Sequence, residues 1–154
     1  METVQFRRTA ASFARILSET RVHASCKQRR AMTQTGSFRD LKVWQQAMGL
    51  VEDVYRVTAR FPAEERFGLT TQIRRAAVSI PSNIGEGRRR KRQRAYLHFL
   101  DIALGSQGEV EVQLEIARRL GFMPMQDYER LVNRTVEIGK MLNGLIESMQ
   151  PYDG

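Results

Sequence analysis

Apolar residues recur at steps of three and four along four stretches of the chain, and this period predicts four amphipathic helices. The first stretch follows Ser37, a residue that can cap a helix, and ends at Phe61–Pro62, because the residue before a proline disfavours the helical conformation. Its apolar face consists of Leu41, Trp44, Met48, Val51, Tyr55 and Thr58. The other helices are expected to begin near Glu64, within or just after the basic run 88–94, and at Asp127. No alternating run predicts a strand, so the pattern predicts an all-α, antiparallel, up-and-down four-helix bundle.

Proline and glycine interrupt two of these helices. Pro81 lies within the second apolar stripe, where it removes one backbone N–H and crowds the carbonyl four residues earlier, so a kink is expected. Gly85 and Gly87 weaken the helix beyond it, and Gly87 is expected to mark its end. Gly105 and Gly108 lie in the middle of the third helix, where each costs about 1 kcal/mol relative to alanine. A close approach between helices is the simplest compensation for that cost.

The composition is that of a globular protein with an excess of basic residues. A length of 154 residues suits one domain, which we expect to span residues 37–154. The net charge of +8 favours polyanionic partners such as nucleic acid, an anionic membrane surface or an acidic protein. No stretch approaches the roughly 18 apolar residues of a membrane span, and the single cysteine, Cys26, excludes an internal disulfide. These features predict a cytoplasmic protein with no membrane partner.

Residues 1–36 differ from the rest of the chain, because they hold seven Lys and Arg against two acidic residues. We predict a basic, disordered extension here, outside the bundle. A second interpretation is that translation begins at Met32. A third is a targeting or anchoring helix, since the segment resembles a mitochondrial presequence with an apolar stripe. The mass of the native N-terminus would separate the first two.

The residues offer little for catalysis. His23 and His98 are isolated, and no cysteine or histidine pair has the spacing of a metal site. Phosphate-binding glycine motifs are absent, and no serine has a histidine base at a predictable position. Glu109, Glu111 and Glu115 resemble a carboxylate cluster, but they lack the Glu-x-x-His partners of di-metal bundles and are more simply solvated partners of nearby arginines. We therefore expect no enzymatic activity, no metal and no cofactor.

The strongest candidate for a functional surface is the run of cations that follows Gly87. Most of the excess positive charge of the bundle lies in this run, and five of its six cations are arginines, whose planar guanidinium group suits phosphate. Tyr96 and Phe99 nearby could stack on unpaired bases, although a residue such as Phe99 more often belongs to a core or an interface. A solvated turn between helices is the other interpretation of this run. The candidate nucleic-acid-binding residues are Arg74, Arg75, Arg88, Arg89, Arg90, Lys91, Arg92 and Arg94.

Several blocks of the sequence resemble one known family. The most specific are RRAAVSIPSNI at 74–84, followed by EG, and IALGS at 102–106 with the glutamates after it. Together with stretches of the first and last helices, these blocks resemble the bacterial four-helix-bundle family, also called 23S rRNA intervening-sequence proteins. The resemblance runs from about Phe38 to Ile146. The chain departs from the family pattern at Gly85, where alanine is usual, and in the density of its basic run.

The resemblance carries implications about assembly and partners. Family members form up-and-down bundles, are expected to assemble as homopentamers, and are often encoded in insertions within bacterial 23S rRNA genes. They are also similar to the accessory variability protein of diversity-generating retroelements, a basic pentameric barrel that binds nucleic acid and a reverse transcriptase. The resemblance implies no enzymatic activity, and it implies polyanion contact at Arg74, Arg75 and, by position, the basic run.

Two hypotheses about function remain. The first is a non-enzymatic homo-oligomer that binds RNA or DNA backbone through a basic surface, with low sequence specificity. The second is an interaction scaffold, or an accessory factor for a reverse transcriptase or another partner, without direct binding of nucleic acid. Salt-dependent binding of generic RNA and DNA separates the two hypotheses.

Overall fold

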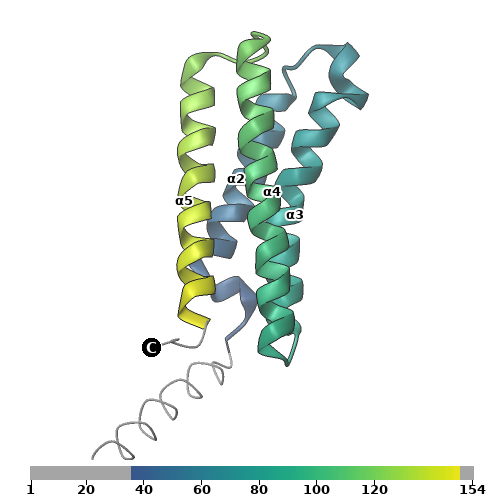
Figure 1. Cartoon of the computed structure of the whole chain (residues 1–154). Coiled ribbons are helices and arrows are strands. Elements are labelled where there is room, and N and C mark those ends of the chain that lie inside the picture. The colour runs from purple at the N-terminus through teal and green to yellow at the C-terminus, as the bar shows by residue number, and fades with distance from the viewer. Residues whose placement is uncertain (1–35, 150–154) are drawn as a thin grey trace, which may run out of the picture. The chain divides into compact units, whose positions relative to one another are not determined.

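The computed structural model describes residues 36–149, which form four long helices and two short 3-10 turns (Figure 1). The elements in chain order are η1 (Phe38–Asp40), α2 (Lys42–Thr58), η2 (Ala63–Phe67), α3 (Leu69–Arg89), α4 (Gln93–Arg119) and α5 (Met125–Met149). No strand occurs within residues 36–149, and the prediction of an all-α four-helix bundle is confirmed. The predictions about the N-terminal extension lie outside the described residues.

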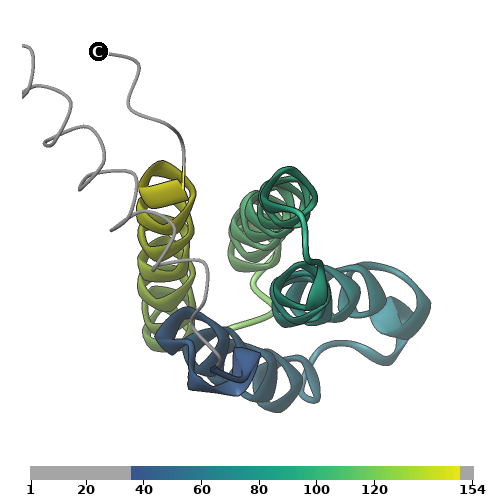
Figure 2. The same cartoon turned by 90° about the horizontal axis from the view of Figure 1, so that it is seen from below.

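Each long helix packs against two neighbours: α2 lies against α3 and α5, and α4 lies against the same two helices. Successive helices are connected at alternate ends of the bundle (Figure 1). As a result η1, the α3–α4 connection and the end of α5 share one end of the bundle, which Figure 2 shows from below. The side-chain amide of Gln93, the first residue of α4, donates a hydrogen bond to the backbone carbonyl of Met149 at this end.

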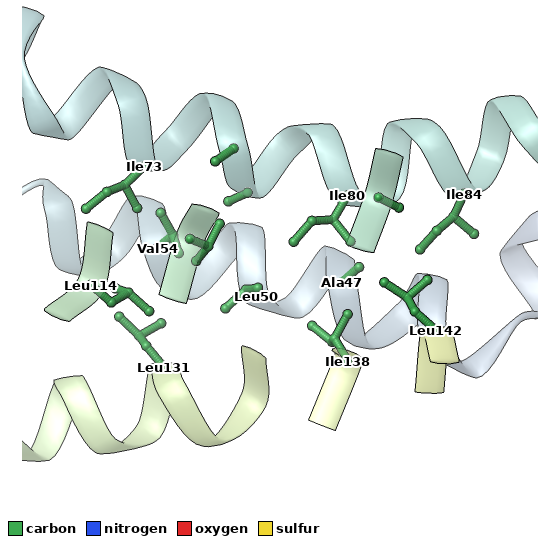
Figure 3. Close-up of a cluster of buried hydrophobic side chains, with 14 of the residues drawn as sticks. Ala47, Leu50, Val54, Ile73, Ile80, Ile84, Leu114, Leu131, Ile138 and Leu142 are labelled. Carbon is green, nitrogen blue, oxygen red and sulfur yellow. The ribbon is translucent and has the colours of Figure 1, made fainter. Parts of the chain in front are cut away.

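Aliphatic side chains from all four helices form the core (Figure 3). The largest fully buried ones include Leu50, Val54, Ile73, Ile80, Ile84, Leu100, Leu114, Leu131, Ile138 and Leu142. Full burial of such a side chain stabilises the fold by about 1.5–3 kcal/mol, so these stripes hold the bundle together. None of the helices within residues 36–149 combines the length and the hydropathy of a membrane-spanning segment.

Two helices begin later than the sequence pattern predicts. Ser37 caps η1, where its Oγ accepts a hydrogen bond from the N–H of Arg39 at 3.3 Å, and α2 begins only after Leu41. The backbone of Leu41 is extended, with ψ of 121°, which separates the two elements. Glu65 lies in η2, and its Oε2 accepts a hydrogen bond from the N–H of Leu69, the first residue of α3, at 2.9 Å. Ser37 therefore caps η1 and not α2, whereas Glu65 in η2 accepts a hydrogen bond from the first residue of α3.

The end of α3 also differs from the prediction. The helix continues beyond Pro81 and through both glycines to Arg89, so the prediction that Gly87 ends it is wrong. Gly87 is buried where α3 touches α4, and a Cβ there would lie 2.7 Å from the Cβ of Phe99 and 2.8 Å from Cδ2 of Tyr96. Gly87 therefore serves close packing of two helices rather than chain reversal. The kink at Pro81 stays a prediction.

The two glycines inside α4 and the glycine that follows it have different environments. A Cβ at Gly105 or Gly108 would meet no neighbouring atom within 4 Å, so the close helix approach predicted there is wrong within the described chain. Packing within residues 36–149 does not explain these two glycines. Gly121 follows the end of α4, and its φ is +73°, a conformation that glycine adopts without strain.

Candidate nucleic-acid interface

The basic end of the bundle consists of the last turn of α3, the α3–α4 connection and the first turn of α4. Its cations are Arg88, Arg89, Arg90, Lys91, Arg92 and Arg94. The connection is short, since α3 ends at Arg89 and α4 begins at Gln93. Arg90 and Arg92 have extended backbones with ψ of 130° and 126°. The structure therefore presents the whole run on one tight turn, mostly exposed to solvent.

The arginines at the end of α3 lie over aromatic rings. The distances from Cζ to the ring centroid are 6.0 Å for Arg88 and Tyr96, 5.2 Å for Arg89 and Phe38, and 5.3 Å for Arg90 and Phe99. Arg90 also pairs with Glu86, one helical turn earlier. A cation–π contact at an exposed site contributes about 0.5–1 kcal/mol, so these guanidinium groups are partly ordered before any ligand binds.

The cations at the start of α4 have a different environment. Lys91, Arg92 and Arg94 are exposed and make no ion pair or ring contact with any residue in the range 36–149. Arg92 occupies the N-cap position, although arginine has no acceptor for the free N–H groups, and the first turn contains no acidic residue. Cations at a helix N-terminus oppose the helix dipole by about 0.3–1 kcal/mol. The residues at the start of α4 thus destabilise this helix, and local sequence of this kind is typical of functional sites. A bound anion would offset the unfavourable interaction between these cations and the helix dipole.

Arg74 and Arg75 lie away from the basic end. They precede Arg89 by about 15 residues along α3, which is roughly 22 Å at the helical rise. The Nε of Arg74 donates a hydrogen bond to Oγ1 of Thr58 at 2.8 Å, and its Cζ lies 4.7 Å from the ring centroid of Tyr55. Arg74 therefore ties α3 to the end of α2, while Arg75 is exposed. The structure does not bring these two candidates together with the run.

The two aromatic candidates are not equivalent. Tyr96 is buried and packs against Gly87, so the prediction that its ring stacks on bases is wrong. Burial raises the pKa of its hydroxyl, although the charge of Arg88 opposes the shift. Its Oη has no hydrogen-bond partner among the described residues. Phe99 is half-buried beneath Arg90 and supports that cation from the α4 side.

A charge cluster that no sequence pattern predicted lies between α2 and α5. Asp53 is only 7% exposed, and its carboxylate accepts hydrogen bonds from Arg56 at 2.6 Å, Arg130 at 2.8 Å and Arg134 at 2.6 Å. Gly49 makes room for this arrangement, because a Cβ there would lie 2.9 Å from Nη1 of Arg134. A buried carboxylate with three guanidinium partners joins the two helices. We call this group the Asp53 cluster.

A second carboxylate extends the Asp53 cluster. Asp127 accepts hydrogen bonds from Arg130 at 2.9 Å and Arg60 at 2.6 Å. Hydrogen bonding from Arg130 and then from Arg60 holds the pKa of the Asp127 carboxyl below its usual value. No signal in the sequence pointed to Asp53, because the predicted apolar stripe passes through Val51 and Tyr55. The buried face of α2 instead contains Leu50, Asp53 and Val57.

The glutamates of α4 serve as charge and hydrogen-bond partners. Glu115 accepts hydrogen bonds from Arg118 at 2.6 Å and Arg119 at 2.7 Å, as predicted, and these bonds hold the pKa of its carboxyl well below the usual range. Glu109 accepts a hydrogen bond from Gln113 at 2.8 Å. Across residues 36–149, no three His, Cys, Asp or Glu side chains are grouped as a metal site would require.

Fold and charge together define a class: a small four-helix bundle with a cationic turn at one end. Comparison with known proteins then gives the family. Residues 39–144 match the 23S rRNA-intervening sequence proteins, and the chain belongs to this family, as the sequence blocks predicted.

One solved structure is similar over most of its length. It is the crystal structure of a protein of unknown function from the S23 ribosomal protein family of Bacteroides thetaiotaomicron VPI-5482. It is 26% identical with a TM-score of 0.64, and the match covers 68% of this chain and 95% of that one. No protein with a curated description matches the chain.

Proposed function

We propose that this protein is a non-enzymatic, cytoplasmic bundle that binds the backbone of RNA or DNA through its basic end. The observation that carries the proposal is the set Lys91, Arg92 and Arg94, three exposed cations with no acidic partner among the described residues. They lie where a helix N-terminus already favours an anion.

The contacts expected of this surface are to phosphate. Arginine presents parallel N–H donors that match two phosphate oxygens, and the free N–H groups at the start of α4 add further donors. Contacts of this kind position a protein on nucleic acid without reading its sequence. The proposal therefore includes low sequence specificity and an affinity that falls steeply with salt.

The proposal also includes a homo-oligomer, with a pentamer as the expected assembly. An apolar stripe on the outer face of α4 supports it, since Ile102, Val112, Ile116 and Leu120 are exposed by 38–61%. Gly105 lies on the same stripe and has open space above it, which would allow another helix to approach closely. Several basic ends in one assembly would make binding multivalent. Light scattering tests the assembly, and a monomer at micromolar concentration would contradict it.

An electrophoretic shift assay with generic RNA and DNA tests the binding. Two variants are compared, each lacking three positive charges. The basic-end variant carries K91Q, R92Q and R94Q, and the charge-matched control carries R66Q, R119Q and K140Q, all at exposed positions outside the candidate binding set. We expect the basic-end variant to lose most of the shift at 150 mM salt and the control to keep it. Equal shifts for both variants and the unmodified protein would contradict the proposal.

A second candidate function is an interaction scaffold for a protein partner, such as a reverse transcriptase. The exposed stripe on α4 favours it, because an apolar face of this kind suits a partner helix as well as a second copy. Capture of a protein partner that survives nuclease treatment, together with no shift of free RNA or DNA, would favour the scaffold.

A further inference from the structure

An apolar hollow lies between α2 and α3, directly beside the basic end. Its volume is about 370 Å³, near the lower end of the roughly 300–1,000 Å³ of small-molecule sites. One wall consists of Phe38 from η1 with Trp44 and Val51 from α2, and the other consists of the α3 segment around Pro81 and Gly85. A hollow of this size suits a flat ring system better than a helix.

The walls have the shape and chemistry of a stacking site. The rings of Phe38 and Trp44 meet edge to face, with centroids 5.2 Å apart and planes at 69°. Gly85 faces Phe38, and a Cβ there would lie 3.5 Å from the ring carbon Cδ2, in ordinary contact. Because Gly85 has no side chain, a gap the size of a methyl group is left between α3 and the edge of the Phe38 ring.

Positive charge surrounds this aromatic wall. Arg89 lines the hollow, and its Cζ lies 5.2 Å from the Phe38 ring centroid, while the Cζ of Arg39 lies 4.7 Å from the same centroid. Glu86 also lines the hollow, and it is the partner of Arg90. A ligand that complements this surface has a flat apolar part and an anionic part a few ångströms away.

We propose that an unpaired base of single-stranded nucleic acid enters this hollow, while its phosphate backbone follows the basic end. The inference rests on the proposed function and names its ligand class. Bases in a duplex are stacked and paired, and they do not reach the hollow without being extruded. A single strand pays no such cost, and stacking on aromatic side chains favours it by roughly 5- to 150-fold per base.

Trp44 makes the hollow directly observable, because it is the one tryptophan of the chain and lines the site. The experiment uses the full chain with three probes of equal phosphate number: a single strand, the same strand with abasic positions, and a duplex. Fluorescence anisotropy of a dye on each probe measures affinity, and the emission of Trp44 reports entry into the hollow. We expect quenching of Trp44 by the single strand alone, and at least tenfold weaker binding of the abasic strand.

A variant that fills the hollow sharpens the test. Ser82 is exposed and lines the hollow, so Ser82→Leu occupies it without changing the charge. The matched control is Ser148→Leu, because both serine hydroxyls are exposed and donate at 2.7 Å to a backbone carbonyl of the preceding turn. We expect Ser82→Leu to bind the single strand as weakly as the abasic strand, and Ser148→Leu to behave like the unmodified protein.

The outcomes separate the two proposals. Equal affinity for the intact and abasic strands, with unchanged Trp44 emission, would overturn the inference and leave the proposed function in place. Failure of all three probes to bind would overturn both. The comparison of intact and abasic strands needs no variant, so it decides the question even if Ser82→Leu fails to fold.

Discussion

Arginine serves two different purposes in two regions of this bundle. In the Asp53 cluster, four arginines share the carboxylates of Asp53 and Asp127 and join α2 to α5. At the basic end, Lys91, Arg92 and Arg94 have no acidic partner in the described part of the chain, although Arg90 pairs with Glu86. The difference shows that a buried acid turns arginine into a structural residue, whereas a turn without one leaves the cations accessible to a ligand.

The largest effect on stability should come from neutralising the buried carboxylate of the Asp53 cluster. Asp53→Asn leaves three guanidinium groups around a neutral side chain. The carboxylate is buried while its partners are exposed by 36–65%, so solvent offsets part of the cost, and we expect a loss of about 2–4 kcal/mol in the free energy of unfolding. Urea denaturation measures the loss. Glu52→Gln, at an exposed neighbouring position, should change stability by less than about 0.5 kcal/mol. A similar loss for both variants would refute the structural role of the cluster.

The next effect concerns the packing that supports the basic end. Gly87→Ala places a methyl group 2.7 Å from the Cβ of Phe99, so we expect destabilisation by about 1–3 kcal/mol. Gly144→Ala meets open space and should stabilise α5 by up to about 1 kcal/mol, through helix propensity. Thermal unfolding of the two variants measures both effects. A stabilising Gly87→Ala would show that α3 and α4 are not closely packed there.

A smaller loss of stability is expected at low pH, where the Glu115 carboxylate near the C-terminal end of α4 becomes protonated. The Glu115 carboxyl has a lowered pKa, because Arg118 and Arg119 donate hydrogen bonds to it. Its contribution to stability is therefore fully present above about pH 4.5, its unperturbed value, and is lost as the pH falls further. Denaturation between pH 6 and pH 3 should show this loss, and Glu115→Gln should flatten that part of the curve. An unchanged curve would contradict the ion pairs.

The smallest effect on stability should come from the basic end itself. The basic-end variant removes cations that oppose the dipole of α4, so we expect its free energy of unfolding to stay within about 0.5 kcal/mol or to rise slightly. Chemical denaturation beside the unmodified protein measures this. A loss of several kcal/mol would mean that these cations, like those of the Asp53 cluster, hold the fold together.

The sequence was informative wherever a local pattern decides the structure. The apolar stripes predicted four helices, and most of the cations 88–94 are exposed where α3 meets α4. These features depend on residues a few positions apart, whose spacing can be read directly.

Features that depend on contact between helices escaped prediction. Asp53 meets Arg130 and Arg134 across more than 70 positions, and no local spacing announces that pairing. Gly87 has the sequence context of a helix end, yet the close approach of Tyr96 and Phe99 determines its role. The same packing buries the ring of Tyr96, which the sequence alone left available for stacking.

The salt dependence of nucleic-acid binding shows whether the cations of the basic end contact phosphate. Affinity for a single-stranded oligonucleotide is measured from 50 to 300 mM salt for the unmodified protein, the basic-end variant and the charge-matched control. If Lys91, Arg92 and Arg94 contact phosphate, the negative slope of log K against log salt should become shallower by about 2 in the basic-end variant, since each contact contributes about −0.7. The control should keep the slope of the unmodified protein. Identical slopes for all three proteins would contradict the account.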